Sequence, residues 1–372
     1  MLQLHLCAKR APCLRATVGL TKSRSQIALS SVLKAAAFTT ASADQASERN
    51  GPQDSLRRSY LYVPASSGRM LEKSLSTPSD VIIYDLEDSV PPSPEHKNNA
   101  RNRLTDFLLS KSTSELPEAR RVAVRLNSIH TPFFQEDIIA ALRLPIITTF
   151  VLPKIHSPQD LHYVSRKIYE HRQFTTSQSV TNAPIRFVAS IESARSLFNI
   201  GAIAGWQSEH GPLLGGRLSA LLFAAEDYCA DTSIIRTPSR RELLYTRSQV
   251  SVTARAFGLE AIDMVCINYR DPAYLKEECQ DGRELGYTGK QAIHPAQVDV
   301  IQSTFVPTAK EILRAARIVH HMNHAHANEK GAIGLPLEGG GEEMIDAPMI
   351  KQAENTIRAA KAAGLHIPEI IQ

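Results

Sequence analysis

The chain has 372 residues, of which 43% are hydrophobic and 22% are charged, a composition typical of globular proteins. No apolar run approaches the roughly 20 residues that a membrane-spanning helix needs, which excludes a predicted span. The net charge of +4 arises in residues 1–43, which hold six Lys and Arg and no Asp or Glu. The remainder has 36 Lys and Arg against 38 Asp and Glu, or −2, and this argues against a nucleic-acid-binding protein.

Residues 1–55 are predicted to form a mitochondrial transit peptide and a linker. The acid-free part is rich in Arg, Lys, Ser and Ala, and it lacks the apolar core of about 7–15 residues that a secretory signal has. The stretch from Thr39 to Ser55 is polar and built of small residues, as linkers are. We therefore expect a protein of the mitochondrial matrix, with a disordered tail as the alternative interpretation of this segment.

From Ser59 onward, short apolar runs rich in β-forming residues alternate with longer helical stretches. Runs that are apolar on both faces, each followed by a helix, indicate a parallel sheet covered by helices. Eight such units in roughly 240 residues predict a closed (β/α)8 TIM barrel. The alternative, an open doubly wound sheet of the dinucleotide-binding type, would have a G-x-G-x-x-G motif after its first strand, and none is present.

We place the catalytic barrel at residues 56–305 and a C-terminal helical extension at residues 306–372. The predicted strands are residues 59–64, 81–86, 122–126, 148–153, 186–191, 219–225, 261–267 and, more weakly, 291–293.

Charged side chains recur where the predicted strands end. In a barrel all these ends meet at one face, where active sites are built. Charged groups are unfavourable there unless they pair or bind a metal. Structural salt bridges would explain any single residue, but the complete set favours an enzyme. The set includes Asp85, Glu87, Asp88, Arg125, Lys154, Glu192, Asp227 and His294.

Motifs such as YLYVPASSGR, SIESARS, AAEDYCAD and GKQAIHP occur in order between about residues 57 and 350. They resemble the citrate lyase β-subunit-like branch of the HpcH/HpaI aldolase/citrate lyase superfamily, which includes malyl-CoA and citramalyl-CoA lyases. The resemblance implies a homotrimer or hexamer that uses Mg²⁺. It also implies a carbon–carbon lyase or synthase that converts malyl-CoA or citramalyl-CoA to acetyl-CoA plus glyoxylate or pyruvate, or catalyses the reverse reaction with thioester hydrolysis.

The same resemblance assigns roles to residues at the strand ends. Glu192 and Asp227 match the metal ligands, which suits Mg²⁺ because this hard ion takes few carboxylates and keeps several waters. Glu192 is also a substrate-binding position, since the 2-oxo acid would chelate the ion beside it. Arg125 matches the arginine that contacts the oxo acid and stabilises the developing oxyanion. The acidic cluster that orients this arginine corresponds to Asp85, Glu87 and Asp88.

Two further groups match positions that bind the CoA thioester. Tyr62, Arg69 and Lys73 form the first group. Arg69 and Lys73 are four residues apart, so they share a helix face that would suit the CoA phosphates, although a solvated basic face would have the same spacing. Ile293 and His294 match contacts on the adenine side, and we interpret His294 as a packing and hydrogen-bonding residue rather than a catalytic base.

Asp346 lies in Met-Ile-Asp-Ala-Pro, which resembles a MIDxP motif in the family's C-terminal extension. The resemblance makes Asp346 the candidate general base that deprotonates the acyl-CoA methyl group, from a lid that closes over a neighbouring subunit. Two other functions stay open. One is a citrate lyase β subunit that cleaves a citryl thioester within a complex, and the other is a non-catalytic barrel. The intact charged residues argue against the second.

Overall fold

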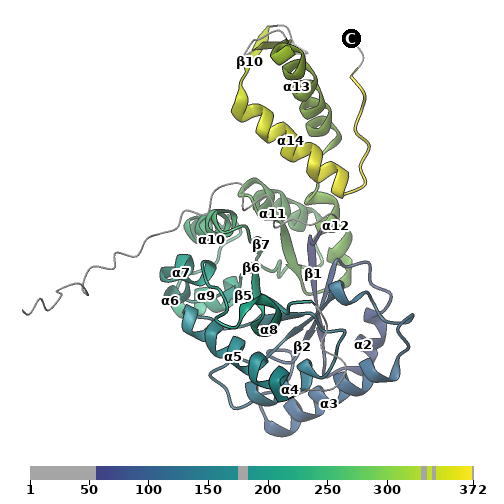
Figure 1. Cartoon of the computed structure of the whole chain (residues 1–372), viewed down its shortest axis with the longest axis vertical. Coiled ribbons are helices and arrows are strands. Elements are labelled where there is room, and N and C mark those ends of the chain that lie inside the picture. Colours follow the sequence, from purple (N-terminus) through teal and green to yellow (C-terminus); the bar gives the residue numbers. More distant parts are fainter. Residues whose placement is uncertain (1–55, 175–182, 328–332, 337–340, 371–372) are drawn as a thin grey trace, which may run out of the picture. The chain divides into compact units, whose positions relative to one another are not determined.

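The computed structural model describes residues 56–174, 183–327, 333–336 and 341–370 (Figure 1). The predicted transit peptide and linker lie outside the described residues. Eight parallel strands pair in sequence order, and β8 closes on β1. This closed barrel with helices between its strands confirms the predicted TIM-barrel fold. None of the described helices is long and apolar enough to cross a membrane.

The strands agree closely with the sequence prediction at the beginning of the barrel and less closely at its end. The seventh strand ends at residue 263 rather than 267, and the weakly predicted eighth strand begins two residues earlier than expected. The strands are β1 Ser59–Pro64, β2 Val81–Asp85, β3 Val122–Arg125, β4 Thr149–Leu152, β5 Arg186–Ile191, β6 Arg217–Phe223, β7 Glu260–Asp263 and β8 Gly289–Ala292.

Helices surround the barrel on its outer side (Figure 1). They are α2 Gly68–Ser74, α3 Pro94–Ser110, α4 Phe134–Leu142, α5 Pro158–Phe174, α6 Ala194–Phe198, α7 Ile200–Ala204, α8 Gly211–Gly215, α9 Ala225–Thr232, α10 Leu244–Ala256, α11 Pro272–Glu284 and α12 Val298–Thr304. Three short 3-10 turns are η1 Ala119–Arg121, η2 Arg241–Leu243 and η3 Pro295–Gln297.

Alternate residues of β1 to β7 pack in two separate apolar layers. In β2, Val81 and Ile83 belong to the cluster that fills the barrel interior, whereas Ile82 and Tyr84 belong to the cluster between the barrel and its helices. All four side chains are fully buried. This two-sided burial explains why the strands are apolar without alternation, and it leaves the strand ends as the place for charged groups.

The C-terminal segment has its own small core. Helices α13 Ala309–Ala327 and α14 Ala347–Ala362 pack together. Strands β9 Ile333–Pro336 and β10 Glu342–Ile345 form an antiparallel pair that the sequence did not predict. Apolar side chains of these elements form a cluster separate from those of the barrel.

Candidate active site

Eight side chains at the ends of β1 to β6 are joined by direct contacts, and we call them the mouth cluster. They lie in the carboxyl-terminal half of a strand or just after it, on consecutive parallel strands whose carboxyl ends meet at one end of the barrel. The mouth cluster consists of Tyr62, Asp85, Glu87, Asp88, Arg125, Lys154, Glu192 and Asp227.

Arg125, the last residue of β3, is bound by three carboxylates. Its Nε and Nη2 donate to the two oxygens of Asp85, each at 2.7 Å. Its Nη1 lies 3.0 Å from Asp88 Oδ2 and 3.1 Å from Glu87 Oε2. The guanidinium carbon stands 4.7 Å from the centre of the Tyr62 ring. These contacts fix the guanidinium in one orientation.

The paired charges shift the ionisation of both partners. Burial raises the pKa of the Asp85 carboxyl, but the charge and hydrogen bonds of Arg125 outweigh that effect, so the pKa lies below its usual value. Burial likewise lowers the pKa of Arg125, and Asp85 more than reverses the shift. The pair is therefore fully charged at neutral pH.

Lys154 connects the other side of the mouth cluster. Its Nζ lies 3.3 Å from Glu87 Oε1 and 3.3 Å from Asp227 Oδ1, and its backbone N–H donates to Glu192 Oε1. Glu87 thus uses one oxygen for Lys154 and the other for Arg125. The sequence places Lys154 at a strand end but indicates no role for it.

The two buried glutamates bind protons more tightly than usual. Burial, together with the nearby charges of Asp227 and Glu87, raises the pKa of Glu192 to about 8 although Lys154 opposes the shift. Burial raises the pKa of Glu87 to about 7, and Arg125 opposes that shift. Carboxyl groups with these pKa values are typical of functional sites.

Glu192 and Asp227 fit a magnesium ion. Glu192 is buried and Asp227 is half-buried, and one residue, Lys154, contacts both carboxylates. Among the described residues, no group of three or more His, Cys, Asp or Glu side chains is arranged to hold a metal. A pair of carboxylates nevertheless suits Mg²⁺, which binds one or two carboxylates and completes its shell with water and substrate oxygens.

The Tyr62 hydroxyl is held in place by a hydrogen bond to a residue of β8. Its hydroxyl donates to Gln291 Oε1 at 3.0 Å, and the Gln291 amide donates to the carbonyls of Phe223 and Asp263. Gln291 belongs to β8, so this contact joins the first and last strands of the barrel. Gln291 could not be identified from the sequence, because a single glutamine in a weak strand gives no signal of its partners.

Apart from Tyr62, which belongs to the mouth cluster, the predicted thioester-binding residues lie in two exposed places. Arg69 and Lys73 lie on α2, the helix after β1, and both side chains are exposed. Ile293 and His294 follow β8 directly and are also exposed. His294 Nδ1 accepts a hydrogen bond from the Ala296 amide, and its ring stacks on Tyr269 with centroids 5.0 Å apart.

Asp346 is the N-cap residue of α14, and its carboxylate accepts a hydrogen bond from the Met349 amide at 3.3 Å. This is the usual N-cap interaction of an aspartate. The contacts that join the mouth cluster do not involve Asp346 in the part of the chain that the structure describes. Asp346 is exposed, which leaves its carboxylate accessible.

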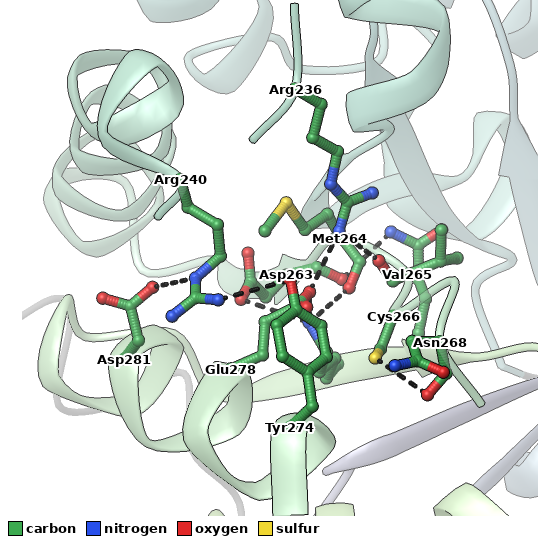
Figure 2. A network of polar contacts seen from close by, with 12 residues as sticks. Arg236, Arg240, Asp263, Met264, Val265, Cys266, Asn268, Tyr274, Glu278 and Asp281 are labelled. Carbon is green, nitrogen blue, oxygen red and sulfur yellow. Dashed lines mark hydrogen bonds and ion pairs between the residues drawn. The ribbon is translucent and has the colours of Figure 1, made fainter. Parts of the chain in front are cut away.

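A buried ionic network joins β7, β8 and α11 (Figure 2). Lys290 of β8 donates to Glu278 Oε1 at 2.9 Å and lies 3.6 Å from Asp263. Arg236 donates to the same Glu278 oxygen at 3.2 Å and also pairs with Glu226, the neighbour of Asp227 in α9. The network thus connects the last two strands to the helix that carries a candidate metal ligand.

A family model described as HpcH/HpaI aldolase/citrate lyase matches residues 58–295. The mitochondrial citramalyl-CoA lyase of Homo sapiens is 32% identical over 305 residues, which cover 82% of this chain and 85% of the human one. The citrate lyase subunit beta of Leuconostoc mesenteroides subsp. cremoris is 30% identical over 310 residues, which cover 82% and 94% of the two chains.

Among solved structures, the protein CitE of Mycobacterium tuberculosis in complex with magnesium, acetoacetate and coenzyme A matches with a TM-score of 0.62 and 27% identity. The match covers 82% of this chain and 98% of that one. The family match spans all eight strands of the barrel and agrees with the resemblance seen in the motifs. The chain therefore belongs to the HpcH/HpaI aldolase/citrate lyase family and is a lyase.

Proposed function

We propose that the protein is a Mg²⁺-dependent lyase that cleaves malyl-CoA or citramalyl-CoA to acetyl-CoA and glyoxylate or pyruvate, or that runs the reverse reaction with thioester hydrolysis. The observation that carries this proposal is the placement of Glu192 and Asp227 around Lys154, beside the prearranged Arg125. The names of the human relative and of the ligands in the mycobacterial complex support it.

Glu192 and Asp227 would hold the ion, which when bound supplies Lewis-acid polarisation of a 2-oxo acid carbonyl. Arg125 would stabilise the negative charge that develops on the carbonyl oxygen. Because Asp85 already fixes the guanidinium, this stabilisation requires little reorganisation during the reaction. Glu87 and Asp88 would hold the third guanidinium nitrogen in place.

The CoA thioester would bind to residues that lie in or just after β1 and β8. Tyr62 would contact the thioester, and the cations of Arg69 and Lys73 would bind phosphates. Ile293 and His294 would contact the adenine side, with His294 already oriented by Ala296 and Tyr269.

Asp346 would act as the general base in the synthetic direction, and as the corresponding acid in cleavage. We propose that the C-terminal segment brings it to the barrel mouth of a neighbouring subunit in a homotrimer or hexamer. An exposed carboxylate is accessible for this role, and its N-cap bond fixes its direction at the N-terminus of α14.

We also propose that the protein acts in the mitochondrial matrix, on the basis of the acid-free leader and the mitochondrial relatives. A reporter fused to residues 1–55 should enter mitochondria and be processed. A reporter that stays unprocessed in the cytosol would contradict this localisation.

The substrate proposal is tested with the purified protein alone. Malyl-CoA and citramalyl-CoA are offered for cleavage, and acetyl-CoA or propionyl-CoA with glyoxylate or pyruvate for synthesis, each with Mg²⁺ and with EDTA. We expect turnover of free CoA thioesters only with the metal. Turnover that needs an acyl carrier protein would instead identify a citrate lyase β subunit, and no turnover of any thioester would contradict the proposal.

A further inference from the structure

Lys154 contacts carboxylates from three different parts of the barrel mouth. Glu87 follows β2, Glu192 follows β5, and Asp227 lies in the first turn of α9 after β6. The Lys154 ammonium lies 3.3 Å from both Glu87 and Asp227, while the backbone N–H of the same residue donates to Glu192. One residue therefore reaches both proposed metal ligands.

The backbone of Lys154 is in the left-handed region, with φ of 54°. A residue with a Cβ atom adopts this conformation at an energetic cost, which the surroundings must offset. Here the offsetting contacts are the N–H bond to Glu192 and the ammonium between two carboxylates. In this conformation the backbone N–H of Lys154 reaches Glu192 and its ammonium reaches Asp227.

The two cations of the mouth cluster divide its carboxylates between them. Arg125 pairs with Asp85, Asp88 and one oxygen of Glu87. Lys154 pairs with Asp227 and the other oxygen of Glu87. Thus Lys154 supplies the positive charge on the side of the proposed metal ligands.

We infer that Lys154 is a built-in counter-cation that balances the charge of the proposed metal ligands before an ion binds and competes with the divalent ion for Asp227. This inference rests on the proposed metal site. An ion that binds Asp227 has to share that carboxylate with the ammonium or displace it, and two cations close together repel each other strongly in a partly buried site. After displacement, Glu87 remains as the partner of Lys154.

The test measures metal binding rather than turnover. Mn²⁺ is titrated into the full chain, free Mn²⁺ is followed by electron paramagnetic resonance, and Mg²⁺ is used as competitor. Lys154→Met removes the charge and keeps most of the stem. Lys154→Gly removes the whole side chain, and glycine readily adopts the left-handed backbone conformation found at this position. Lys111→Met is the matched control, because it removes an ammonium that pairs with Glu72 on the surface.

We expect both Lys154 variants to bind Mn²⁺ at least about fivefold more tightly than the wild type, and Lys111→Met to bind it unchanged. We also expect Lys154→Met to melt at a lower temperature than the wild type in EDTA and to gain more from added Mg²⁺. A variant that is merely misfolded would bind Mn²⁺ more weakly, so tighter binding would show that the Lys154 charge competes with the ion.

Two negative results have different meanings. If Glu192→Gln abolishes Mn²⁺ binding but neither Lys154 variant tightens it, the counter-cation role is overturned and the metal site stands. A wild-type protein that binds no Mn²⁺, or whose binding survives both Glu192→Gln and Asp227→Asn, would overturn the metal site and this inference together.

Discussion

Both oxygens of Asp85 bind the guanidinium of Arg125, with Nε–Oδ1 and Nη2–Oδ2 distances of 2.7 Å. Asp85 ends β2 and Arg125 ends β3, and the two residues are directly paired in the barrel register. Adjacent strands therefore place the carboxylate and the guanidinium side by side, and this geometry fixes the cation that the proposed reaction uses.

Replacing Asp85 with Asn should destabilise the fold by about 3 kcal/mol, because a buried guanidinium loses its bidentate partner. Turnover should fall as well, since Arg125 loses its orientation. The matched control is Asp88→Asn, which removes a mostly exposed partner of the same arginine and should cost less than about 1 kcal/mol. Urea unfolding and steady-state kinetics measure both effects. Equal effects of the two variants would contradict the special role of Asp85.

The Asp85 pair should also contribute to acid sensitivity. Because Arg125 lowers the folded-state pKa of Asp85 below its usual value, the pair contributes its full stability above the unfolded pKa. That contribution is lost as the pH falls through the folded pKa. The stability difference between wild type and Asp85→Asn should therefore be constant from about pH 7 to pH 5 and shrink below about pH 4. A difference that persists unchanged at pH 3 would exclude this explanation.

Glu192→Gln and Asp227→Asn should each reduce Mg²⁺-dependent turnover by roughly 10²-fold or more while the fold is retained. Glu192→Gln should be at least as stable as the wild type without metal, because burial and neighbouring carboxylates already disfavour the Glu192 charge. The amide oxygen still accepts the Lys154 N–H. Circular dichroism melting in EDTA checks stability. Near wild-type turnover at limiting Mg²⁺ would show that the ligand is misassigned.

Asp346→Asn separates the proposed base from the helix cap. Asn caps a helix about as well as Asp, so α14 should keep its stability while turnover falls by roughly 10²–10⁴-fold. Asp346→Ala should lose the same activity and also about 1 kcal/mol of stability.

The same variant also tests whether Asp346 acts on a neighbouring subunit. If it does, exchange of subunits between inactive Asp346→Asn and inactive Glu192→Gln proteins should restore part of the activity. No recovery after demonstrated exchange would favour action within one chain. Full activity of Asp346→Asn would remove the base assignment.

Lys290→Met should destabilise the barrel by roughly 3–5 kcal/mol, because it leaves the buried carboxylates of Asp263 and Glu278 short of a positive charge. Lys111→Met, which breaks an exposed pair, should cost no more than about 1 kcal/mol. Both are measured by urea unfolding. Similar costs for the two variants would mean that the network in Figure 2 contributes little to stability.

Local sequence patterns were sufficient to predict the barrel fold and many of the charged residues at the barrel mouth. Residues Val81 to Tyr84 form a short run that is apolar on both faces and is followed by a helix. A strand that is buried on both sides accounts for this pattern. The charged residues at the strand ends, including Arg125 and Glu192, could be found because parallel strands bring their carboxyl ends to one face.

Only the tertiary structure decided which charges meet. Lys290 lies outside the predicted strand 291–293, but it is a fully buried residue of β8, where Glu278 and Asp263 neutralise its charge. Lys154 reaches Glu87 and Asp227, which lie 67 and 73 positions away along the chain, through a left-handed turn that no local pattern specifies. Pairing of charges over such distances depends on the closure of the barrel, so it has no signature in any single segment.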